Sequence, residues 1–323
     1  MLVVLVMVGQ DGRVSIELPT RAEIESAFVR LTGTIRETPL LAVNGDELGV
    51  VGRVLLKLEL TQHTGSFKAR GALNSVLTLP DATGGVVAAS GGNHAAALAW
   101  AASRGGLDAD VFVPATSPNE KVERVRGYGA TAHVVDGYYP DAYESALEWA
   151  AMRPVEYVHA YDRFSTVCGA ASVGLELEMQ APDADSVLVA CGGGGLYAGT
   201  ALALRERTRV IPVEPERCAN LHAAQAAGGP VEVEVGGVAA DTLGASTIGS
   251  YAYETAYRFG AVPALVSDHA IGEARRWLWQ YCRVLAEPGA VTPLAALMSG
   301  AAGVRPGEIT VVVISGGNNP EIP

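Results

Sequence analysis

The sequence predicts an α/β protein with two open, twisted, mostly parallel sheets that are flanked by helices. Length is the first observation, since 323 residues exceed what one hydrophobic core usually serves. The second is a series of short apolar segments that alternate with helix-like segments, and the third is that such a series occurs twice. Strands joined through helices run parallel, and the helices then cover both faces of each sheet.

The N-terminal part contains one clear helix. It is expected after Thr20, which lies three residues before Glu23 in a spacing typical of a helix start. The apolar residues that follow share one helical face: Ile24, Ala27, Phe28 and Leu31. The preceding segment MLVVLVMVG is too short for a membrane span and lacks the basic residues of a secretory signal. We interpret it as a short strand or an irregular start.

The first alternating series predicts a small domain over residues 80–160. Strands are expected near residues 86–90, 109–114, 131–136 and 157–160. Helices are expected near residues 94–105, 119–129 and 141–152. Ser117 and Asp141 each lie three residues before a glutamate and are the expected caps of the last two helices. The remainder, residues 1–79 and 161–323, would form a larger domain.

The second series begins at residue 186. Strands are expected near residues 186–191, 209–215 and 308–314, and helices near residues 196–206 and 220–228. No long polar linker separates the two series, so the predicted domains are expected to share an interface. Ligands of α/β sheets bind at the carboxyl ends of the strands. The residues that directly follow each strand are therefore the candidates for function.

Composition and charge exclude several classes of function. The net charge of -12 opposes binding to nucleic acid or to an anionic membrane, because such partners are usually bound by clustered lysines and arginines. The four cysteines show no spacing typical of a metal site or a disulfide framework, as is usual for a cytoplasmic protein. We therefore expect small-molecule chemistry in the cytoplasm.

A run of four glycines follows the first strand of the second series. In CGGGGLYAGT, residues 191–200, free backbone N–H groups and the positive end of the next helix can surround a phosphate. A tight turn that serves packing alone is the structural alternative. The loop also fits the dinucleotide fingerprint through Gly193, Gly195 and Ala198, and Glu214 is spaced to bind a ribose. On this loop alone, a nicotinamide-dependent oxidoreductase stays open.

Three further stretches carry polar side chains to the same edge of the predicted sheets. TGSFKARGAL places Lys68 after a glycine turn. ASGGNHAAAL places Ser90, Asn93 and His94 at a strand-to-helix turn, where side chains and free N–H groups can bind a carboxylate. VVVISGGNN ends an apolar strand in Ser315. Taken singly, each has an ordinary structural explanation, as a solvated lysine, a helix cap, a core histidine or a turn serine.

The order and spacing of these motifs resemble the fold type II pyridoxal-phosphate enzymes, and among them the serine/threonine dehydratase family. The similarity runs from Pro19 to Asn319 through LKLELTQHTGSFKARGAL, ASGGNHAAALAWAA, CGGGGL and ISGGN. Cysteine synthases and threonine synthases share the fold but typically carry Asp after the lysine, where this chain has Ala69. The resemblance implies a tryptophan synthase beta-like fold, with pyridoxal 5'-phosphate bound in the larger domain.

Each motif then implies a role toward cofactor or substrate. Lys68 looks like the lysine that holds the cofactor as a Schiff base, and Phe67 like the aromatic residue beside the ring. Asn93 is similar to the asparagine that binds the phenolic oxygen, and Ser315 to the residue that faces the pyridine nitrogen. The phosphate cradle would consist of Gly192, Gly193, Gly194 and Gly195 with the amide of Leu196. The substrate carboxylate would be bound by Ser90, Asn93 and His94.

The activity that the resemblance implies is α,β-elimination of a β-hydroxy amino acid, threonine or serine, to a 2-oxo acid and ammonia. For this chemistry the amine of Lys68 must be neutral, so burial beside Phe67 would have to lower its pKa from about 10.4. Gly91 has no side chain to act as the acid that serine racemases of the family place there, so racemisation is expected to be poor. A homodimer is also implied.

Other interpretations stay open from the sequence. The protein could be another lyase of this fold, acting for example on hydroxyaspartate, a dinucleotide-dependent oxidoreductase, or a catalytically silent ligand-binding paralogue. Glu287, in AEPGAV, resembles an acidic position of the dehydratases by motif, and its role is open. Some relatives bind a divalent cation just after the strand that ends at Glu214, but this chain has Cys218 and Asn220 there, so no metal site is predicted.

Overall fold

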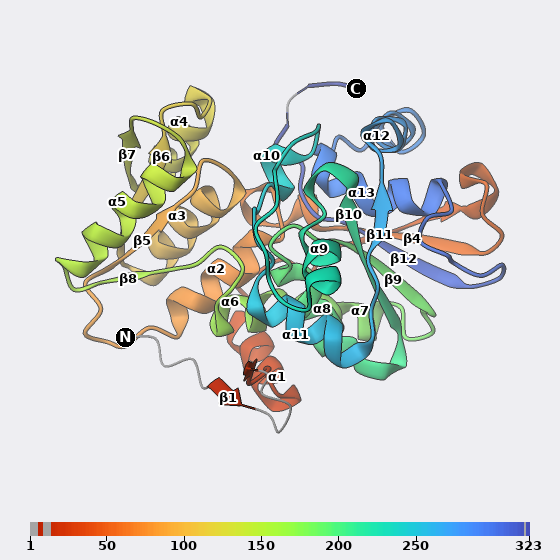
Figure 1. The fold of residues 1–323 in the computed structure, drawn as a ribbon, viewed down its shortest axis with the longest axis horizontal. Coiled ribbons are helices and arrows are strands. Elements are labelled where there is room, and N and C mark those ends of the chain that lie inside the picture. Colours follow the sequence, from red (N-terminus) through yellow and green to blue (C-terminus); the bar gives the residue numbers. More distant parts are fainter. Residues whose placement is uncertain (1–5, 9–13, 320) are drawn as a thin grey trace.

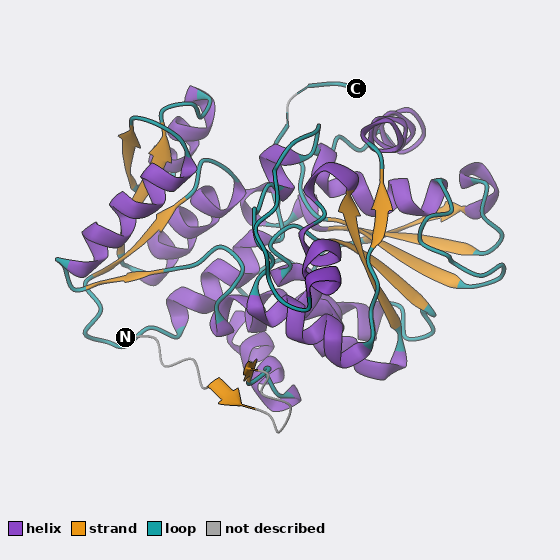
Figure 2. Ribbon diagram, viewed as in Figure 1, coloured by secondary structure: helices purple, strands orange, loops and turns teal. Residues whose placement is uncertain are grey.

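The computed structural model describes residues 6–8, 14–319 and 321–323. Two lobes are visible in Figure 1, each built on its own sheet, and Figure 2 shows helices around both sheets. The strands are β1 (Val6–Val8), β2 (Val14–Ile16), β3 (Leu40–Asn44), β4 (Arg53–Leu58), β5 (Gly85–Ala89), β6 (Asp108–Pro114), β7 (Thr131–Val135), β8 (Val155–Tyr157), β9 (Ser186–Ala190), β10 (Arg209–Pro215), β11 (Ala264–Val266) and β12 (Ile309–Ile314).

The α-helices connect the strands and cover the sheets. They are α1 (Arg21–Leu31), α2 (Lys68–Leu77), α3 (Asn93–Gly105), α4 (Asn119–Gly127), α5 (Tyr139–Ala151), α6 (Phe164–Ala170), α7 (Ser172–Gln180), α8 (Gly195–Leu204), α9 (Asn220–Ala227), α10 (Ala240–Leu243), α11 (Ser250–Phe259), α12 (Asp268–Cys282) and α13 (Pro288–Met298).

The larger sheet has six strands in the order β11-β10-β9-β12-β4-β3. Its neighbours pair in parallel except for β3, which pairs antiparallel with β4 at the edge. Alternate residues of its strands enter two different apolar clusters, since Val187 and Val311 belong to one and Leu188 and Val312 to the other. Because both faces are covered by apolar side chains, the central strands are apolar along their whole length.

The smaller sheet has four parallel strands in the order β7-β6-β5-β8. It also separates two apolar clusters, with Val86 in one and Val87 in the other. The predicted fold class, two mostly parallel sheets flanked by helices, is confirmed. The division into a small domain of residues 80–160 and a larger domain of residues 1–79 and 161–323 stays a prediction.

Helix starts follow the sequence only in part. Thr20 and Glu23 form the predicted capping box of α1. The prediction for Ser117 is wrong, because Pro118 precedes α4 and no side chain caps that end. The prediction for Asp141 is wrong in position. This residue lies inside the first turn of α5, and its carboxylate accepts a hydrogen bond of 2.7 Å from the N–H of Tyr138.

The N-terminal segment forms a small hairpin where it is described. β1 and β2 pair antiparallel, with Val6 opposite Ile16. The predicted short strand therefore includes Val6–Val8, while residues 1–5 lie outside the described part of the chain. Among the helices that the structure describes, none combines the length and the hydrophobicity that a membrane crossing requires.

Helix α2 is held by a fully buried cluster of charges. The guanidinium of Arg70 donates to both carboxylate oxygens of Glu59, at 2.7 Å each, and to Glu176 at 2.6 Å. Lys57 donates to the other oxygen of Glu176 and to the carbonyl of Thr38. Two positive and two negative groups thus balance inside the protein, where unpaired charges would be very costly. The cluster fixes the first turn of α2, two residues from Lys68.

Candidate active site

The predicted site residues lie at the carboxyl ends of strands from both sheets. Ser90 directly follows β5, the glycine run follows Cys191 at the end of β9, and Ser315 directly follows β12. Lys68 is the first residue of α2 and lies next to the end of β12, because Ser66 forms an isolated bridge with Gly316. The topology therefore brings together residues as distant in the sequence as Lys68 and Ser315, which are 247 positions apart.

Lys68 differs from the other lysines in its surroundings. The sequence contains only three, and Lys57 and Lys121 are paired with Glu176 and Asp241. The amine of Lys68 instead donates a hydrogen bond of 2.8 Å to the carbonyl of Ala160. Burial lowers the pKa of Lys68 to about 8, in the direction that the chemistry requires. About a tenth of this amine is therefore neutral at pH 7, far more than for a solvated lysine.

Phe67 and Ser315 are joined through the backbone. The N–H of Phe67 donates to the carbonyl of Ser315 at 3.0 Å, and the N–H of Gly317 donates to Gly65 at the same distance. The Phe67 ring centroid lies 5.1 Å from the amine of Lys68. Both hydrogen bonds couple the start of α2 to the loop after β12, so Lys68 and Ser315 are held at one place.

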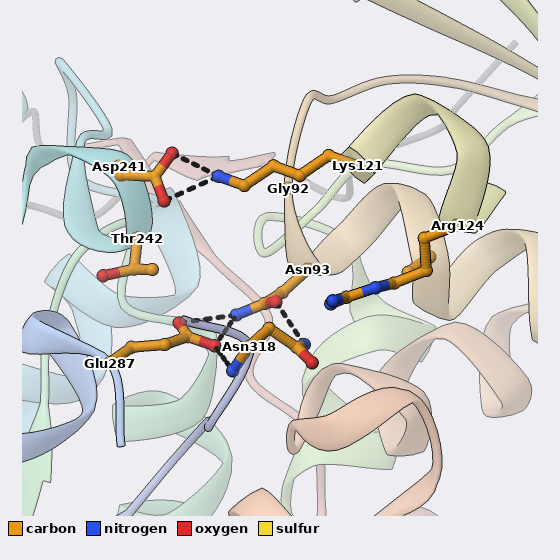
Figure 3. Close-up of a pocket in the computed structure, with 9 residues that line it drawn as sticks. Gly92, Asn93, Lys121, Arg124, Asp241, Thr242, Glu287 and Asn318 are labelled. Carbon is orange, nitrogen blue, oxygen red and sulfur yellow. Dashed lines mark hydrogen bonds and ion pairs between the residues drawn. The ribbon is translucent and has the colours of Figure 1, made fainter. Parts of the chain in front are cut away.

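Asn93 is fixed by two residues from the large lobe (Figure 3). Its Nδ2 donates to both carboxylate oxygens of Glu287, at 3.0 and 2.8 Å, and its Oδ1 accepts from Nδ2 of Asn318 at 2.7 Å. The N–H of Asn318 donates to Glu287 as well, at 2.7 Å. Burial raises the pKa of Glu287, although these donors oppose the shift. Glu287, whose role the sequence leaves open, thus positions the side chain of Asn93.

Ser90 and His94 lie in the turn that starts α3. The hydroxyl of Ser90 accepts the N–H of Gly92 at 3.2 Å. His94 is buried, and its Nε2 is bonded to the carbonyl of Val158 at 2.8 Å, which places the hydrogen on Nε2. Burial, with the positive charge of Lys68, lowers the pKa of His94 to about 3, so the ring is neutral. It is therefore the backbone N–H of His94, at the helix start, that can donate to an anion.

The glycine run forms a tight loop between β9 and α8. Gly194 has φ +85°, a conformation that favours glycine. A Cβ at Gly193 would lie 2.3 Å from the ring of Tyr161, so this position also has no room for a side chain. The first turn of α8 begins at Gly195 and leaves the N–H groups of Gly195 and Leu196 without helical partners. Such a helix start can bind a phosphate.

The carboxylate of Glu214 is occupied by hydrogen bonds within the protein. It is buried at the end of β10, and its carboxylate accepts the N–H of Leu221 at 2.7 Å and of His222 at 3.0 Å. Both N–H groups belong to the first turn of α9, whose positive end favours a carboxylate. The ribose-binding role that a dinucleotide enzyme would require is therefore not available to Glu214.

A pocket lies between the lobes beside Asn93 (Figure 3). Lys121 on α4 and Asp241 on α10 form an ion pair of 2.6 Å across it, and Arg124 extends into it from the same face of α4. In the described ranges 6–8, 14–319 and 321–323, no three His, Cys, Asp or Glu side chains meet as metal ligands.

Fold and site together are those of an α/β protein that can hold a phosphate-bearing small molecule beside a buried lysine amine. The model of the family described as pyridoxal-phosphate dependent enzyme matches residues 31–316. The chain therefore belongs to the family of pyridoxal-phosphate dependent enzymes, and its cofactor is pyridoxal phosphate.

Individual relatives place the chain more closely within that family. It is 33% identical over 302 residues to an L-threonine ammonia-lyase from Geobacter sulfurreducens, which covers 91% of this chain and 74% of that protein. It is 34% identical over 306 residues to phenylserine dehydratase from Ralstonia pickettii, covering 93% and 94%. The structure of maize serine racemase is similar with a TM-score of 0.88, at 28% identity over 94% of each chain.

The residues present fit this cofactor. Lys68 offers a buried amine that no carboxylate neutralises, as an aldehyde requires. The loop after β9 offers backbone N–H groups at a helix start, as a phosphate requires. Asn93 lies beside Gly316, the residue after Ser315, since a Cβ at Gly316 would lie 3.3 Å from Nδ2 of Asn93. The individual roles of these residues stay predictions.

Several site residues escape analysis of the sequence. Asn318 is part of the quoted ISGGN motif, but only the structure shows its contact with Asn93. The segment VHAYD follows β8 and supplies the carbonyl of Ala160 and the ring of Tyr161. Its place at a strand end, with two aromatic rings, is the signal that could have identified it. No sequence pattern indicates that Ser117 lies beside Gly91, yet its Oγ lies 2.2 Å from where a Cβ of Gly91 would be.

Proposed function

We propose that the protein is a pyridoxal-phosphate dependent dehydratase of β-hydroxy amino acids. The net reaction converts R–CH(OH)–CH(NH3+)–COO− to R–CH2–CO–COO− and ammonium, since the water lost in elimination is regained in hydrolysis. The observation that carries the proposal is the isolated amine of Lys68, buried beside a phosphate-type loop. The relatives named L-threonine ammonia-lyase and phenylserine dehydratase support it.

The cofactor's part is to accept the electron pair that remains on the substrate when its α-proton leaves. Lys68, Asn93 and Ser315 would hold the aldehyde, the phenolic oxygen and the ring nitrogen, and residues 192–196 would hold the phosphate. Lys68 is suited to move the proton, because its neutral Nζ can accept it from the substrate Cα and return it later.

Ser315 bears on the type of reaction. A hydroxyl is neutral, so it stabilises a protonated ring nitrogen less than an aspartate would. Less negative charge is then stored in the ring, which favours loss of the β-hydroxyl over transfer of the amino group. We assign binding of the substrate carboxylate to the hydroxyl of Ser90 and to the first N–H groups of α3, at Asn93 and His94.

The test is production of a 2-oxo acid. Purified protein, loaded with pyridoxal phosphate, is incubated with L-serine, L-threonine and L-threo-3-phenylserine, and the 2-oxo acid and ammonium are measured in parallel. Equal amounts of both products are expected from at least one substrate, and Lys68→Ala should abolish them. Absence of both products with these three substrates, and with hydroxyaspartate added as a fourth, would contradict the proposal.

Two further proposals concern the setting of the enzyme. The resemblance to dehydratases supports a homodimer in the cytoplasm that acts on a free amino acid. Sedimentation equilibrium of the purified protein distinguishes a dimer from a monomer. Racemisation is proposed to be weak, because Gly91 has no side chain that could donate a proton to the substrate.

A further inference from the structure

Five aromatic rings form a continuous row in the small lobe. The row consists of Tyr139, Tyr143, Tyr157, His159 and Tyr161. Neighbouring ring centroids in this order are 6.1, 5.7, 6.3 and 4.5 Å apart, in one stacked and three edge-to-face pairs. These distances are within the range of favourable aromatic contacts. We call this set the aromatic row.

The inner end of the aromatic row lies at the candidate active site. The ring of Tyr161 contacts the glycine loop, since a Cβ at Gly193 would lie 2.3 Å from it. Ala160, between the last two members of the row, accepts the hydrogen bond from the amine of Lys68. The positive charge of Lys68 also acts on His159. Two of the five rings therefore flank the amine and the phosphate loop.

The middle of the row borders the loop that is proposed to bind the substrate carboxylate. Tyr157 lies on β8 opposite Val87 of β5, and its hydroxyl contacts the backbone of Ala89, one residue before Ser90. The next residue, Val158, accepts the hydrogen bond from His94. A substrate whose carboxylate is bound at Ser90 and whose Cα faces Lys68 would thus have the row within reach of its side chain.

The outer end of the row opens to solvent. Tyr139, the first residue of α5, is 47% exposed, and its neighbour Tyr138 is 71% exposed. Tyr143 and Tyr157 pack on a small apolar cluster that contains Val87 and Ala146. The row is therefore half exposed at Tyr139 and partly buried at His159 and Tyr161, next to the candidate active site.

The row carries no positive charge at neutral pH. Burial raises the pKa values of Tyr139, Tyr157 and Tyr161 above the ordinary value, so their hydroxyls stay protonated. Burial lowers the pKa of His159, and its Nδ1 accepts the N–H of Asp162 at 2.9 Å, so the ring is neutral with its hydrogen on Nε2. These rings therefore offer no positive charge to a substrate side chain that ends in a carboxylate. They can make stacked and edge-to-face contacts with an aryl group.

We propose that the aromatic row binds the side chain of the substrate, and that the preferred substrates are β-hydroxy amino acids with an aryl group on the β-carbon, such as 3-phenylserine. This inference rests on the proposed dehydratase function and narrows its substrate class. Threonine and serine, with a methyl group or a hydrogen at that place, contact few of the rings.

The test compares kcat/KM for L-threo-3-phenylserine, L-threonine and L-serine, following phenylpyruvate, 2-oxobutanoate and pyruvate. We expect kcat/KM for phenylserine to exceed that for threonine by about tenfold or more, the scale that a hydrophobic side-chain pocket supplies. The Tyr157→Leu and Tyr139→Leu variants should lower the phenylserine-to-serine ratio of kcat/KM by about tenfold. Most of the change should be in KM. Tyr139 is half exposed, so its replacement is tolerated even if Tyr157→Leu fails to fold.

Binding is measured separately with L-phenylalanine and L-alanine, which lack a β-hydroxyl and act as competitive inhibitors. L-phenylalanine should inhibit at lower concentration than L-alanine, and Tyr139→Leu should reduce that difference. Tyr281→Leu, an exposed tyrosine on α12, is the matched control and should change neither ratio.

The outcomes separate this inference from the function on which it rests. If no substrate yields a 2-oxo acid, the dehydratase function itself fails. If serine or threonine is turned over as well as phenylserine, or if the tyrosine variants lower all three equally, the function stands. The aromatic row then serves packing only, and the inference is overturned.

Discussion

At the scale of single residues, environment distinguishes groups that look alike in the sequence. Lys57 is fully buried and Lys68 is half-buried, but Lys57 donates to the carboxylate of Glu176 whereas Lys68 donates to the carbonyl of Ala160. The motif around Lys68 predicts its role, and the structure supplies the cause of its lowered pKa. Lys57 could not be recognised as neutralised, because its partner lies 119 residues away in the sequence.

Glu214 gives a prediction about pH and stability. Burial raises its pKa to about 7 from an ordinary 4.5, although the backbone N–H groups of Leu221, His222 and Asn220 oppose the shift. The folded state therefore binds the proton more tightly than the unfolded state, and the stability from this group falls as the pH rises from 4.5 to 7. A glutamine does not titrate, so the Glu214→Gln variant does not lose this stability as the pH rises. Its free energy of unfolding, relative to wild type, should rise by about 2–3 kcal/mol between pH 5 and pH 8.

Urea denaturation at the two pH values measures this difference. Glu216→Gln, an exposed neighbour, is the control, and its difference from wild type should change by less than about 0.5 kcal/mol. A Glu214→Gln difference that is the same at both pH values would show that Glu214 titrates alike in the folded and unfolded states.

At the scale of elements, helix α2 depends on contacts that no local pattern reveals. Its sequence begins with Lys-Ala-Arg-Gly and carries no capping side chain. Instead of a capping side chain, Arg70 holds the start of the helix, because it donates to Glu59, which precedes the helix in the chain, and to Glu176 on α7. Burial alone would raise the pKa of Glu176, but the bonds from Arg70 and Lys57 hold it below the ordinary value. Glu176 is therefore a charged partner of Arg70.

Removing Arg70 should be strongly destabilising. Arg70→Met leaves Glu59 and part of Glu176 without their buried partner, and we expect a loss of about 3–5 kcal/mol in the free energy of unfolding. Arg126→Met removes an exposed pair with Glu123 in the other lobe and should cost less than about 1 kcal/mol. Chemical denaturation measures the free energy of unfolding of both variants. Equal losses in the two variants would mean that the buried cluster contributes no more to stability than a surface pair.

The periodicity of apolar residues predicted most of the helices and strands. Capping patterns predicted fewer of the residues at which the helices begin. The strands of the smaller sheet and the capping box of α1 follow directly from short-range patterns. The start of α5 does not, because Asp141 can cap a helix from its first turn as well as from in front of it. The contact between Asn93 and Glu287 spans 194 residues, so only the folded chain shows it.

At the scale of the whole molecule, the site is assembled from residues that follow strands of both sheets, whose lobes lie side by side in Figure 1. The small lobe supplies Ser90, Asn93 and the aromatic row, and the large lobe supplies the glycine loop and Ser315. The sequence predicted the smaller sheet, three strands of the larger sheet and the motifs of Ser90, Asn93, the glycine loop and Ser315, but not the aromatic row. It could not predict which side chains close the interface, such as the ion pair between Lys121 and Asp241, because packing between lobes leaves no local pattern.

The central claim is that Lys68, among three lysines, binds the cofactor. The direct measurement is reduction of the pyridoxal-phosphate-loaded protein with borohydride, followed by proteolysis and mass mapping of the modified lysine. We predict a phosphopyridoxyl group on Lys68 alone, and loss of visible cofactor absorption in Lys68→Ala but not in Lys121→Ala. Modification of Lys57 or Lys121 instead, or absorption that survives Lys68→Ala unchanged, would contradict the account.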